Sequence, residues 1–154
     1  MKVSGIRQGI FLYIIFRPVC NNEIIFWKSG LSYIFMDQRG LDLFWEFCKK
    51  EFSDENLKFI TACVELDKSP TMSIFDVKAK YIYSEFIKQG APSEININSA
   101  IKKEIHNIFL PILNQKESLL ARNGNVFEKA YNHIFKLIEK DSYYRFCKTG
   151  LNVV

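Results

Sequence analysis

Hydrophobic residues recur with the spacing of an α-helix along most of the chain from residue 27 onward. The first clear stripe has i, i+3, i+4, i+7 spacing and comprises Leu41, Phe44, Trp45 and Cys48. This spacing puts the four side chains on one face and predicts a helix over 42–50 that packs against a core. Ser53 is the predicted N-cap of the next helix, with Asp54 and Glu55 in its first turn, where the helix dipole stabilises acidic groups.

The helix that follows Ser53 is predicted to extend to about Asp67 and is apolar around much of its circumference. Its apolar members are Leu57, Phe59, Ile60, Cys63, Val64 and Leu66. A helix that is apolar on most sides is buried on most sides. We therefore expect it to be a central helix of a bundle.

A long helix is predicted next, with Ser73 as its cap and with Gly90 and Pro92 ending it. The residues expected on its inner side are Ile74, Val77, Tyr81, Ile82 and Phe86. A short helix then starts at about Ser99, and Pro111 interrupts its pattern. The apolar residues of this short helix are Ile101, Ile105 and Ile108.

The C-terminal part of the chain predicts further helices. Asn125 and Glu128 have the spacing of a capping box at the start of one of them. The apolar residues of that helix are Ala130, Ile134, Leu137 and Ile138. Gly150 is placed to end the last helix, because glycine is common just after a helix C-terminus.

Composition agrees with one all-α domain. The chain has 154 residues, of which 48% are hydrophobic and 25% charged, so it can bury one core and has no signature of disorder. No alternating pattern of a β-strand competes with the helical spacing. We predict a helical domain over 27–151 and an N-terminal extension, of no assigned structure, over 1–26.

The extension contains a short apolar run over 10–16, preceded by Lys2 and Arg7. The run is far shorter than the ~20 residues that a membrane-spanning helix requires. The segment around Arg17 and Cys20 is a poor cleavage site for a secretion signal. Three alternatives stay open for this stretch: it packs on the domain, stays loose, or touches a membrane surface through its aromatic and basic residues.

The net charge and the search for catalytic or metal-binding motifs reduce the range of possible functions. The net charge is +4, and Lys and Arg are scattered among acidic residues, so nucleic-acid binding is not favoured. The four cysteines form no CxxC pair and, with only His106 and His133, give no metal-ligand spacing, so we predict neither a metal site nor a cofactor. Cys48 and Cys63 fall within helical apolar patterns and are expected to be small buried residues. The chain has no Gly-rich phosphate loop and no nucleophile motif, which argues against an enzyme.

Three polar segments interrupt the apolar helical chain: EFSDENLKF at 51–59, GAPSEININ at 90–98 and LIEKDSYYRF at 137–146. Their order and their amino-acid sequences resemble those of the regulator of G-protein signalling (RGS) domain, and the resemblance covers residues 27–151. It implies a single all-α bundle of about nine helices with a four-helix antiparallel subdomain. Ile60 departs from the family pattern, which usually has Trp at that position.

The resemblance implies a function. RGS domains are not enzymes themselves, and they accelerate GTP hydrolysis by the α subunit of heterotrimeric G proteins. The implied partner is a GTP-bound or transition-state α subunit of the inhibitory or Gq class, and the implied location is cytoplasmic, with contact at the inner face of the plasma membrane left open. A scaffold or adaptor of the same fold, without GTPase-activating activity, is the alternative.

The same resemblance implies a set of residues that bind the switch regions of the α subunit. They are Phe52, Ser53, Glu55, Asn56, Asn96, Leu137, Asp141, Ser142 and Arg145. In the family, the residue matching Asn96 reaches the catalytic Gln of the α subunit. The residue matching Asp141 accepts hydrogen bonds from a switch backbone, and the one matching Arg145 holds that Asp in place.

The residues alone also allow purely structural roles. Glu55 would stabilise a helix start, and Asn96 would satisfy the backbone of its loop. Leu137, Asp141 and Arg145 are four apart, which predicts one nearly straight helical stripe with an ordinary Asp–Arg ion pair worth ~0.3 kcal/mol. We predict that seven of these residues converge at one end of the bundle: Glu55, Asn56, Asn96, Leu137, Asp141, Ser142 and Arg145.

Overall fold

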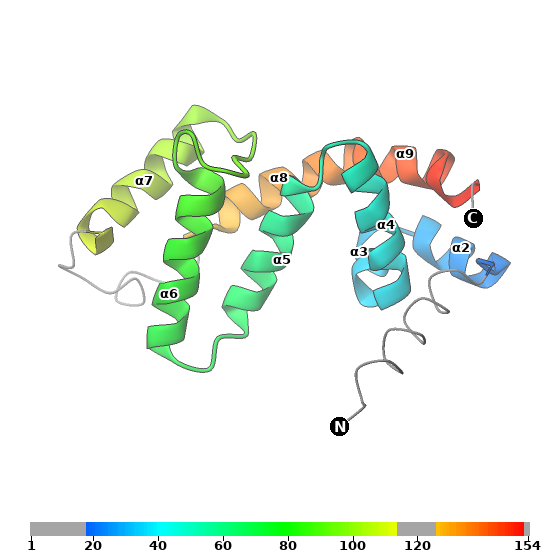
Figure 1. The fold of residues 1–154 in the computed structure, drawn as a ribbon, viewed down its shortest axis with the longest axis horizontal. Coiled ribbons are helices and arrows are strands. Elements are labelled where there is room, and N and C mark those ends of the chain that lie inside the picture. Colours follow the sequence, from blue (N-terminus) through cyan, green and yellow to red (C-terminus); the bar gives the residue numbers. More distant parts are fainter. Residues whose placement is uncertain (1–17, 114–125, 153–154) are drawn as a thin grey trace, which may run out of the picture. The chain divides into compact units, whose positions relative to one another are not determined.

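The computed structural model describes residues 18–113 and 126–152, and this part of the chain is helical, without a strand (Figure 1). The predicted all-α fold is confirmed. Contacts divide the chain into two compact units, Met1–Ser53 with Glu139–Val154, and Asp54–Ile138. Each unit is described by itself below.

The first unit contains four α-helices among its described residues, followed by a 3-10 turn at Gly150–Asn152. The helices are α2 (Asn21–Lys28), α3 (Leu31–Met36), α4 (Gln38–Lys50) and α9 (Ser142–Lys148). The predicted apolar stripe of α4 faces the core as expected, since Phe44 and Cys48 are buried. The Phe146 ring of α9 packs on α4, with its centroid 5.1 Å from that of Phe44. The last helix ends at Lys148, two residues before the predicted stop at Gly150.

Helix α2 is anchored by Trp27, whose side chain is fully buried. The backbone of Gly40 in α4 lies so close that a Cβ there would meet the indole Nε1 at 2.6 Å. The Tyr143 hydroxyl of α9 donates to the Trp27 carbonyl oxygen at 2.9 Å. Trp27 therefore ties α2, α4 and α9 together. Helix α2 crosses the predicted boundary between 26 and 27, and that boundary stays a prediction.

A second tie joins α2 to α4, because Arg39 Nη1 donates to both carboxylate oxygens of Glu23 at 2.7 Å. Partial burial raises the pKa of the Glu23 carboxyl, but the hydrogen bond from the Cys20 amide and the Arg39 guanidinium more than offset this effect. The pKa falls from its ordinary 4.5 to about 2. A lowered carboxyl pKa means that the ionised form stabilises the fold above about pH 4.5, and that this stability is lost as the pH falls toward 2.

We expect Glu23→Gln to lower the free energy of unfolding by about 2 kcal/mol at pH 7, because it weakens the charge-assisted hydrogen bonds between this side chain and the buried Arg39 guanidinium. Urea unfolding at pH 7 and at successively lower pH measures this. The difference from the unsubstituted chain should shrink between pH 4.5 and 2. Glu46→Gln is the control, since Glu46 pairs with Lys49 on the exposed surface. A pH-independent loss for Glu23→Gln would contradict the assignment.

The second unit contains α5 (Glu55–Asp67), α6 (Met72–Ile82), a π-helix, η1, at Tyr83–Ile87, α7 (Ser99–Leu113) and most of α8 (Glu128–Lys140). Figure 1 shows α5 and α6 running side by side in opposite directions. The core of α5 is as predicted, since Leu57, Phe59, Ile60 and Cys63 are buried. The Phe59 ring meets those of Phe86 and Phe127, with centroids 5.8 and 6.4 Å away.

Two predictions for α6 are wrong. Thr71, not Ser73, caps the helix, because the Thr71 hydroxyl accepts a hydrogen bond from the Ile74 amide at 3.3 Å. The inner face is also partly different: Ile82 and Phe86 are buried as predicted, but Ile74, Val77 and Tyr81 are exposed. Phe75 and Ala79 are buried instead. Both faces of α6 carry apolar residues, so spacing alone could not choose the one that packs on α5.

Helix α7 continues through Pro111, where the sequence predicted an interruption. Pro111 lies in the last turn, so it removes only one backbone hydrogen bond near the helix end. The buried Phe109 side chain anchors this turn. At the other end, the Asn98 side chain accepts from the Ile101 amide at 2.8 Å and caps the helix. The predicted capping box at Asn125 lies outside the described residues.

Candidate functional site

The turn after α4 holds Phe52 in the left-handed backbone region, with φ 53°. The Phe52 amide donates to the Lys49 carbonyl at 3.1 Å, and the Ser53 amide donates to the Cys48 carbonyl at 3.0 Å. This pair of bonds is a Schellman motif, in which glycine is the usual left-handed residue. A non-glycine residue in this conformation costs about 1–3 kcal/mol. The Phe52 side chain is 93% exposed, so the strained turn presents a large aromatic ring to solvent and not to a core.

Ser53 completes this turn and does not cap α5, which corrects the sequence prediction. Its hydroxyl lies 3.4 Å from the Cys48 carbonyl, to which it donates. The residue at the cap position of α5 is Asp54, whose side chain makes no capping hydrogen bond and instead pairs with Lys58 at 2.9 Å. The Ser53 amide is hydrogen-bonded within the Schellman turn, so the next residue, Asp54, stands at the cap position of α5.

The predicted straight stripe through Leu137, Asp141 and Arg145 is wrong. Helix α8 ends at Lys140, and α9 begins at Ser142. Asp141 lies between them with φ −117° and ψ −82°, outside the helical region, so the four-residue spacing crosses a break in the helix. The Asp141–Arg145 ion pair itself is formed, as predicted.

Arg145 has a second carboxylate partner that sequence reasoning missed. Its Nε and Nη2 lie 2.8 and 2.6 Å from Glu51 Oε2. The hydrogen bond to Asp141 and then that to Glu51 raise the pKa of the guanidinium, which stays charged. Glu51 precedes Phe52 in the turn after α4, so Arg145 brings Asp141 beside this turn. Glu51 and Arg145 are 94 residues apart, and no local pattern indicates that they meet.

Ser142, at the start of α9, is buried and only 5% exposed. Its position beside the ion pair agrees with the sequence prediction, but its side chain faces the interior. Leu137, on α8, is 37% exposed. Of these two predicted contact residues, only Leu137 presents its side chain to solvent.

Asn56, the second residue of α5, is buried and has an unsatisfied acceptor. Its Nδ2 donates to Glu55 Oε1 at 3.2 Å. Its Oδ1 is buried and has no hydrogen-bond partner among the described residues. An unpaired buried polar atom costs about 1–3 kcal/mol. Helix capping therefore does not account for Asn56, whereas Glu55 does lie in the first turn, where the dipole stabilises it.

Asn96 is exposed at the tip of a tight turn between η1 and α7. The Ile97 amide donates to the Ile95 carbonyl at 3.2 Å, a bond that closes a γ-turn around Asn96. The flanking Ile95 and Ile97 side chains are buried and anchor the turn. Within the described chain, the Asn96 side chain makes no hydrogen bond, so satisfying the loop backbone is not its role.

The rest of this loop is tied to η1. The Ser93 amide donates to the Glu85 carbonyl at 3.0 Å, and the Ser93 hydroxyl donates to Glu85 Oε1 at 2.7 Å. The Ile95 amide donates to the Phe86 carbonyl at 3.0 Å. These bonds fix the path of the loop that carries Asn96.

The family described as "Regulator of G protein signaling domain" matches residues 30–152. The chain belongs to this RGS family. It is 34% identical to "Regulator of G-protein signaling 18" of Homo sapiens, over 86% of this chain and 52% of that protein. It is 38% identical to "Regulator of G-protein signaling 21" of Homo sapiens, over 84% of this chain and 78% of that protein.

A third relative, "Regulator of G-protein signaling 18" of Mus musculus, is 33% identical over 85% of this chain and 52% of that protein. The chain thus spans about half the length of the relatives named regulator 18. The RGS match covers all nine predicted site residues and all three polar segments.

The predicted site residues of this RGS domain divide between the two units. The first unit holds Phe52, Ser53, Asp141, Ser142 and Arg145, which Glu51 joins into one cluster, and the second holds Glu55, Asn56, Asn96 and Leu137. Glu55 and Asn56 are hydrogen-bonded to each other. No hydrogen bond among the described residues joins Asn96 or Leu137 to them. The predicted single surface over Glu55, Asn56, Asn96, Leu137, Asp141, Ser142 and Arg145 stays a prediction.

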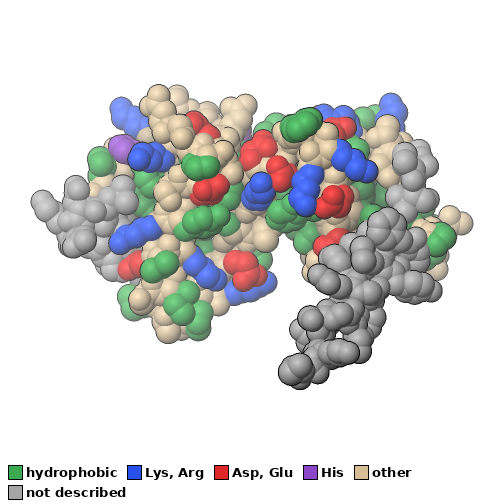
Figure 2. All heavy atoms as spheres, in the orientation of Figure 1, with side chains coloured by type: hydrophobic (Ala, Val, Ile, Leu, Met, Phe, Trp, Pro, Cys, Tyr) green, Lys and Arg blue, Asp and Glu red, His purple; other side chains and the backbone are tan. Residues whose placement is uncertain are grey.

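The described residues contain no cluster of His, Cys, Asp and Glu that could hold a metal ion. Their helices include none with the length and apolar character needed to span a membrane. On the face that Figure 2 shows, basic and acidic side chains are interspersed, in keeping with the scattered charge of the sequence.

Proposed function

We propose that this RGS domain accelerates GTP hydrolysis by the α subunit of a heterotrimeric G protein and is not itself an enzyme. Membership of the RGS family supports this function. The observation that carries it is Asn96, an exposed amide at the tip of an anchored turn that serves no partner within the described chain. Such a group is held in readiness to bind another molecule.

The proposed mechanism is restraint of the partner's switch loops. An α subunit carries its own catalytic Arg and a Gln that positions the attacking water. The RGS domain would bind the switch loops best in their transition-state geometry, and each ~1.4 kcal/mol of that preference gives a tenfold increase in rate. Asn96 would hold the Gln, while Asp141, oriented by Arg145 and Glu51, would accept hydrogen bonds from a switch backbone.

The cluster around Arg145 supports this role for Asp141. Arg145 contacts both Asp141 and Glu51, so the Asp141 carboxylate is positioned before any partner arrives. Groups that are oriented in advance lose less entropy on binding. The exposed Phe52 ring lies next to Glu51 in sequence and would add apolar contact area at the same place.

Partner class and location are part of the proposal. We propose an α subunit of the inhibitory or Gq class as the partner. We propose a cytoplasmic location, with contact at the inner face of the plasma membrane through the basic and aromatic residues of the first stretch.

Single-turnover GTP hydrolysis by inhibitory-class and Gq-class α subunits, with and without the full chain, tests the function. We expect at least a tenfold acceleration for one of these classes, which requires ~1.4 kcal/mol of differential binding. Binding should be tight to the α subunit with GDP and aluminium fluoride and weaker with GDP alone. Binding without acceleration of either class would instead support a scaffold or adaptor.

A further inference from the structure

The first unit carries a group of exposed apolar side chains on α2 and α3, two helices that pack against each other (Figure 1). The four residues, called the α2–α3 patch below, are Ile25, Phe26, Tyr33 and Met36. Met36 is 75% exposed and Ile25 is 65% exposed. None of the four is among the nine residues predicted to bind the switch regions. Exposed apolar patches on a soluble domain commonly mark a binding surface.

The α2–α3 patch is held in place by ring packing and by buried side chains beneath it. The Phe26 and Tyr33 rings meet edge to face with centroids 5.1 Å apart, so the pair joins α2 to α3. Met36 follows Tyr33 by three residues and therefore lies on the same face of α3. Trp27 and Leu31, which are fully buried, fix the two helices to the core. The patch is thus a preformed surface of the folded unit.

The chain around the α2–α3 patch is basic. Residues 1–36 contain four basic residues against one acidic residue, Glu23, and so supply three of the four net positive charges of the chain. The basic residues are Lys2, Arg7, Arg17 and Lys28. The Glu23 carboxylate is paired with the buried Arg39 guanidinium. The other exposed polar residues of α2 and α3 are uncharged: Asn21, Asn22 and Ser32. The surroundings of the patch therefore favour an anionic partner.

We propose that the α2–α3 patch inserts into the headgroup region of an anionic membrane surface. The inference deepens the proposed contact at the inner face of the plasma membrane, on which it rests, by assigning part of that contact to the folded domain. Aromatic and apolar side chains suit the boundary between headgroups and acyl chains, and basic residues are attracted to anionic lipids. A second copy of this chain would instead bring two patches of like charge together. A lipid surface complements both the apolar side chains and the positive charge.

The contact has a consequence for how the domain is presented. Trp27 fixes α2 to the core of the first unit, and the Tyr143 hydroxyl of α9 donates to the Trp27 carbonyl oxygen. Insertion of side chains from α2 and α3 would therefore orient the whole first unit at the membrane surface. A domain and an α subunit held at the same surface meet at a higher effective concentration.

Flotation of the full chain with vesicles of phosphatidylcholine and phosphatidylserine tests the contact. Ile25→Gln/Met36→Gln should bind about tenfold more weakly, because two apolar side chains no longer enter the interface. The matched control is Met72→Gln/Val77→Gln, which changes side chains of α6 that are 59% and 66% exposed and should alter binding less than about twofold. Circular dichroism verifies that each variant is folded. Equal losses in the two double variants would overturn the proposal.

Lipid composition and charge variants locate the contact. Vesicles of phosphatidylcholine alone should bind the full chain several-fold more weakly, and added salt should weaken binding to the anionic vesicles. Lys2→Gln/Arg7→Gln should also weaken binding, through loss of positive charge in the first stretch. If that variant loses binding while Ile25→Gln/Met36→Gln binds normally, the first stretch alone makes the contact and the patch is overturned.

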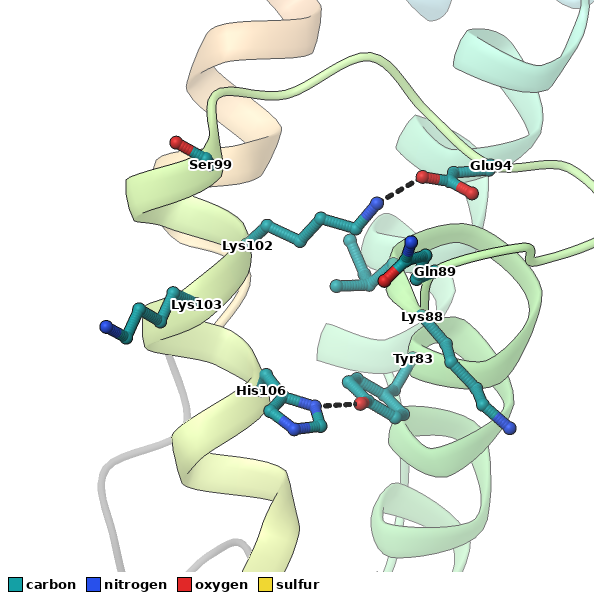
Figure 3. Close-up of a pocket in the computed structure, with 9 residues that line it drawn as sticks. Tyr83, Lys88, Gln89, Glu94, Ser99, Lys102, Lys103 and His106 are labelled. Atoms are coloured by element: carbon teal, nitrogen blue, oxygen red, sulfur yellow. Dashed lines mark hydrogen bonds and ion pairs between the residues drawn. The ribbon is translucent and has the colours of Figure 1, made fainter.

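A separate basic region in the second unit provides a further comparison. In the pocket between η1 and α7, Lys102 pairs with Glu94, while Lys88 and Lys103 extend away from the centre (Figure 3). Lys88→Gln/Lys103→Gln should retain most of the vesicle binding. Loss of binding in this variant, with normal binding by Ile25→Gln/Met36→Gln, would place the contact at the pocket and overturn the patch.

Sedimentation analysis tests the second copy as the occupant. The full chain should sediment as a monomer at the concentrations used for flotation. A dimer that Ile25→Gln/Met36→Gln dissociates would show that the α2–α3 patch is an interface between copies, and the membrane proposal would be wrong.

Hydrolysis assays without vesicles keep this inference separate from the proposed function. Ile25→Gln/Met36→Gln should accelerate GTP hydrolysis in solution as well as the unsubstituted chain does, since neither residue belongs to the predicted switch-binding set. If no α subunit is accelerated, the proposed function fails while the vesicle result stands. If acceleration occurs and the patch variant binds vesicles like the unsubstituted chain, the membrane inference fails alone.

Discussion

Replacing Asn96 with alanine is expected to lower the accelerated rate of GTP hydrolysis by about 100-fold. Asn96 stands exposed on a γ-turn between two buried isoleucines, and the loop around it is tied to η1 by hydrogen bonds. Removing a single oriented polar group that acts in a transition state typically costs about 10²–10³ in rate. Single-turnover hydrolysis with a saturating amount of the domain measures the loss.

Asn98→Ala is the matched control, because Asn98 is an exposed asparagine in the same loop with a different role. Its side chain caps α7 through the Ile101 amide. Loss of this cap should cost about 1 kcal/mol in the free energy of unfolding and leave the accelerated rate within a few-fold. Full activity of Asn96→Ala would refute the assigned role of the turn, and equal losses for both variants would point to general loosening of the loop.

Replacing Trp27 with alanine is expected to lower the free energy of unfolding by about 3–5 kcal/mol. The Trp27 side chain is fully buried, and its ring fills the space above the Gly40 backbone. Large-to-small substitution at such a site loses both the burial of the ring and the packing around the cavity left behind. Urea unfolding followed by circular dichroism measures the change.

Phe26→Ala provides the comparison, since Phe26 is the adjacent aromatic residue of α2 but is 41% exposed. Its ring makes one edge contact with Tyr33, with centroids 5.1 Å apart. We expect a loss of about 1 kcal/mol or less. Similar losses for the two variants would show that α2 is not anchored by Trp27. A large loss for Trp27→Ala alone would place residues before 30 within the folded domain.

The helices could be predicted where an apolar stripe had one possible partner. The stripe through Phe44 and Cys48 and the mostly apolar α5 both gave buried faces as expected. The prediction was right for Ile82 but failed for the rest of α6, where Val77 and Phe75 lie on competing apolar faces and only packing on α5 decides between them. The predicted Ser73 cap of α6 failed because Thr71, two residues earlier, offers an equivalent hydroxyl. Ser53 failed as the cap of α5 because its backbone completes the Schellman turn after α4.

The sequence names a set of candidate site residues, which stays a prediction, but not how those residues are arranged. Asn56 and Asn96 were singled out by the resemblance to RGS domains, and the structure gives each a physical reason, an unpaired buried oxygen and an exposed turn. Glu51 was missed, although it lies next to Phe52. Its role depends on Arg145, which is distant in sequence, so only folding brings the pair together.

The sequence by itself determined that this chain is helical, that α5 is buried, and that three polar segments mark an RGS domain. These features depend on local spacing and on residue identity, which the sequence carries directly. Tertiary structure alone decided the left-handed backbone at Phe52, the break at Asp141 and the joining of Glu51, Arg145 and Asp141. At Phe52 the hydrogen bonds of the Schellman turn override the usual preference of a non-glycine residue. Glu51 and Arg145 meet because folding brings together segments that are distant in the chain.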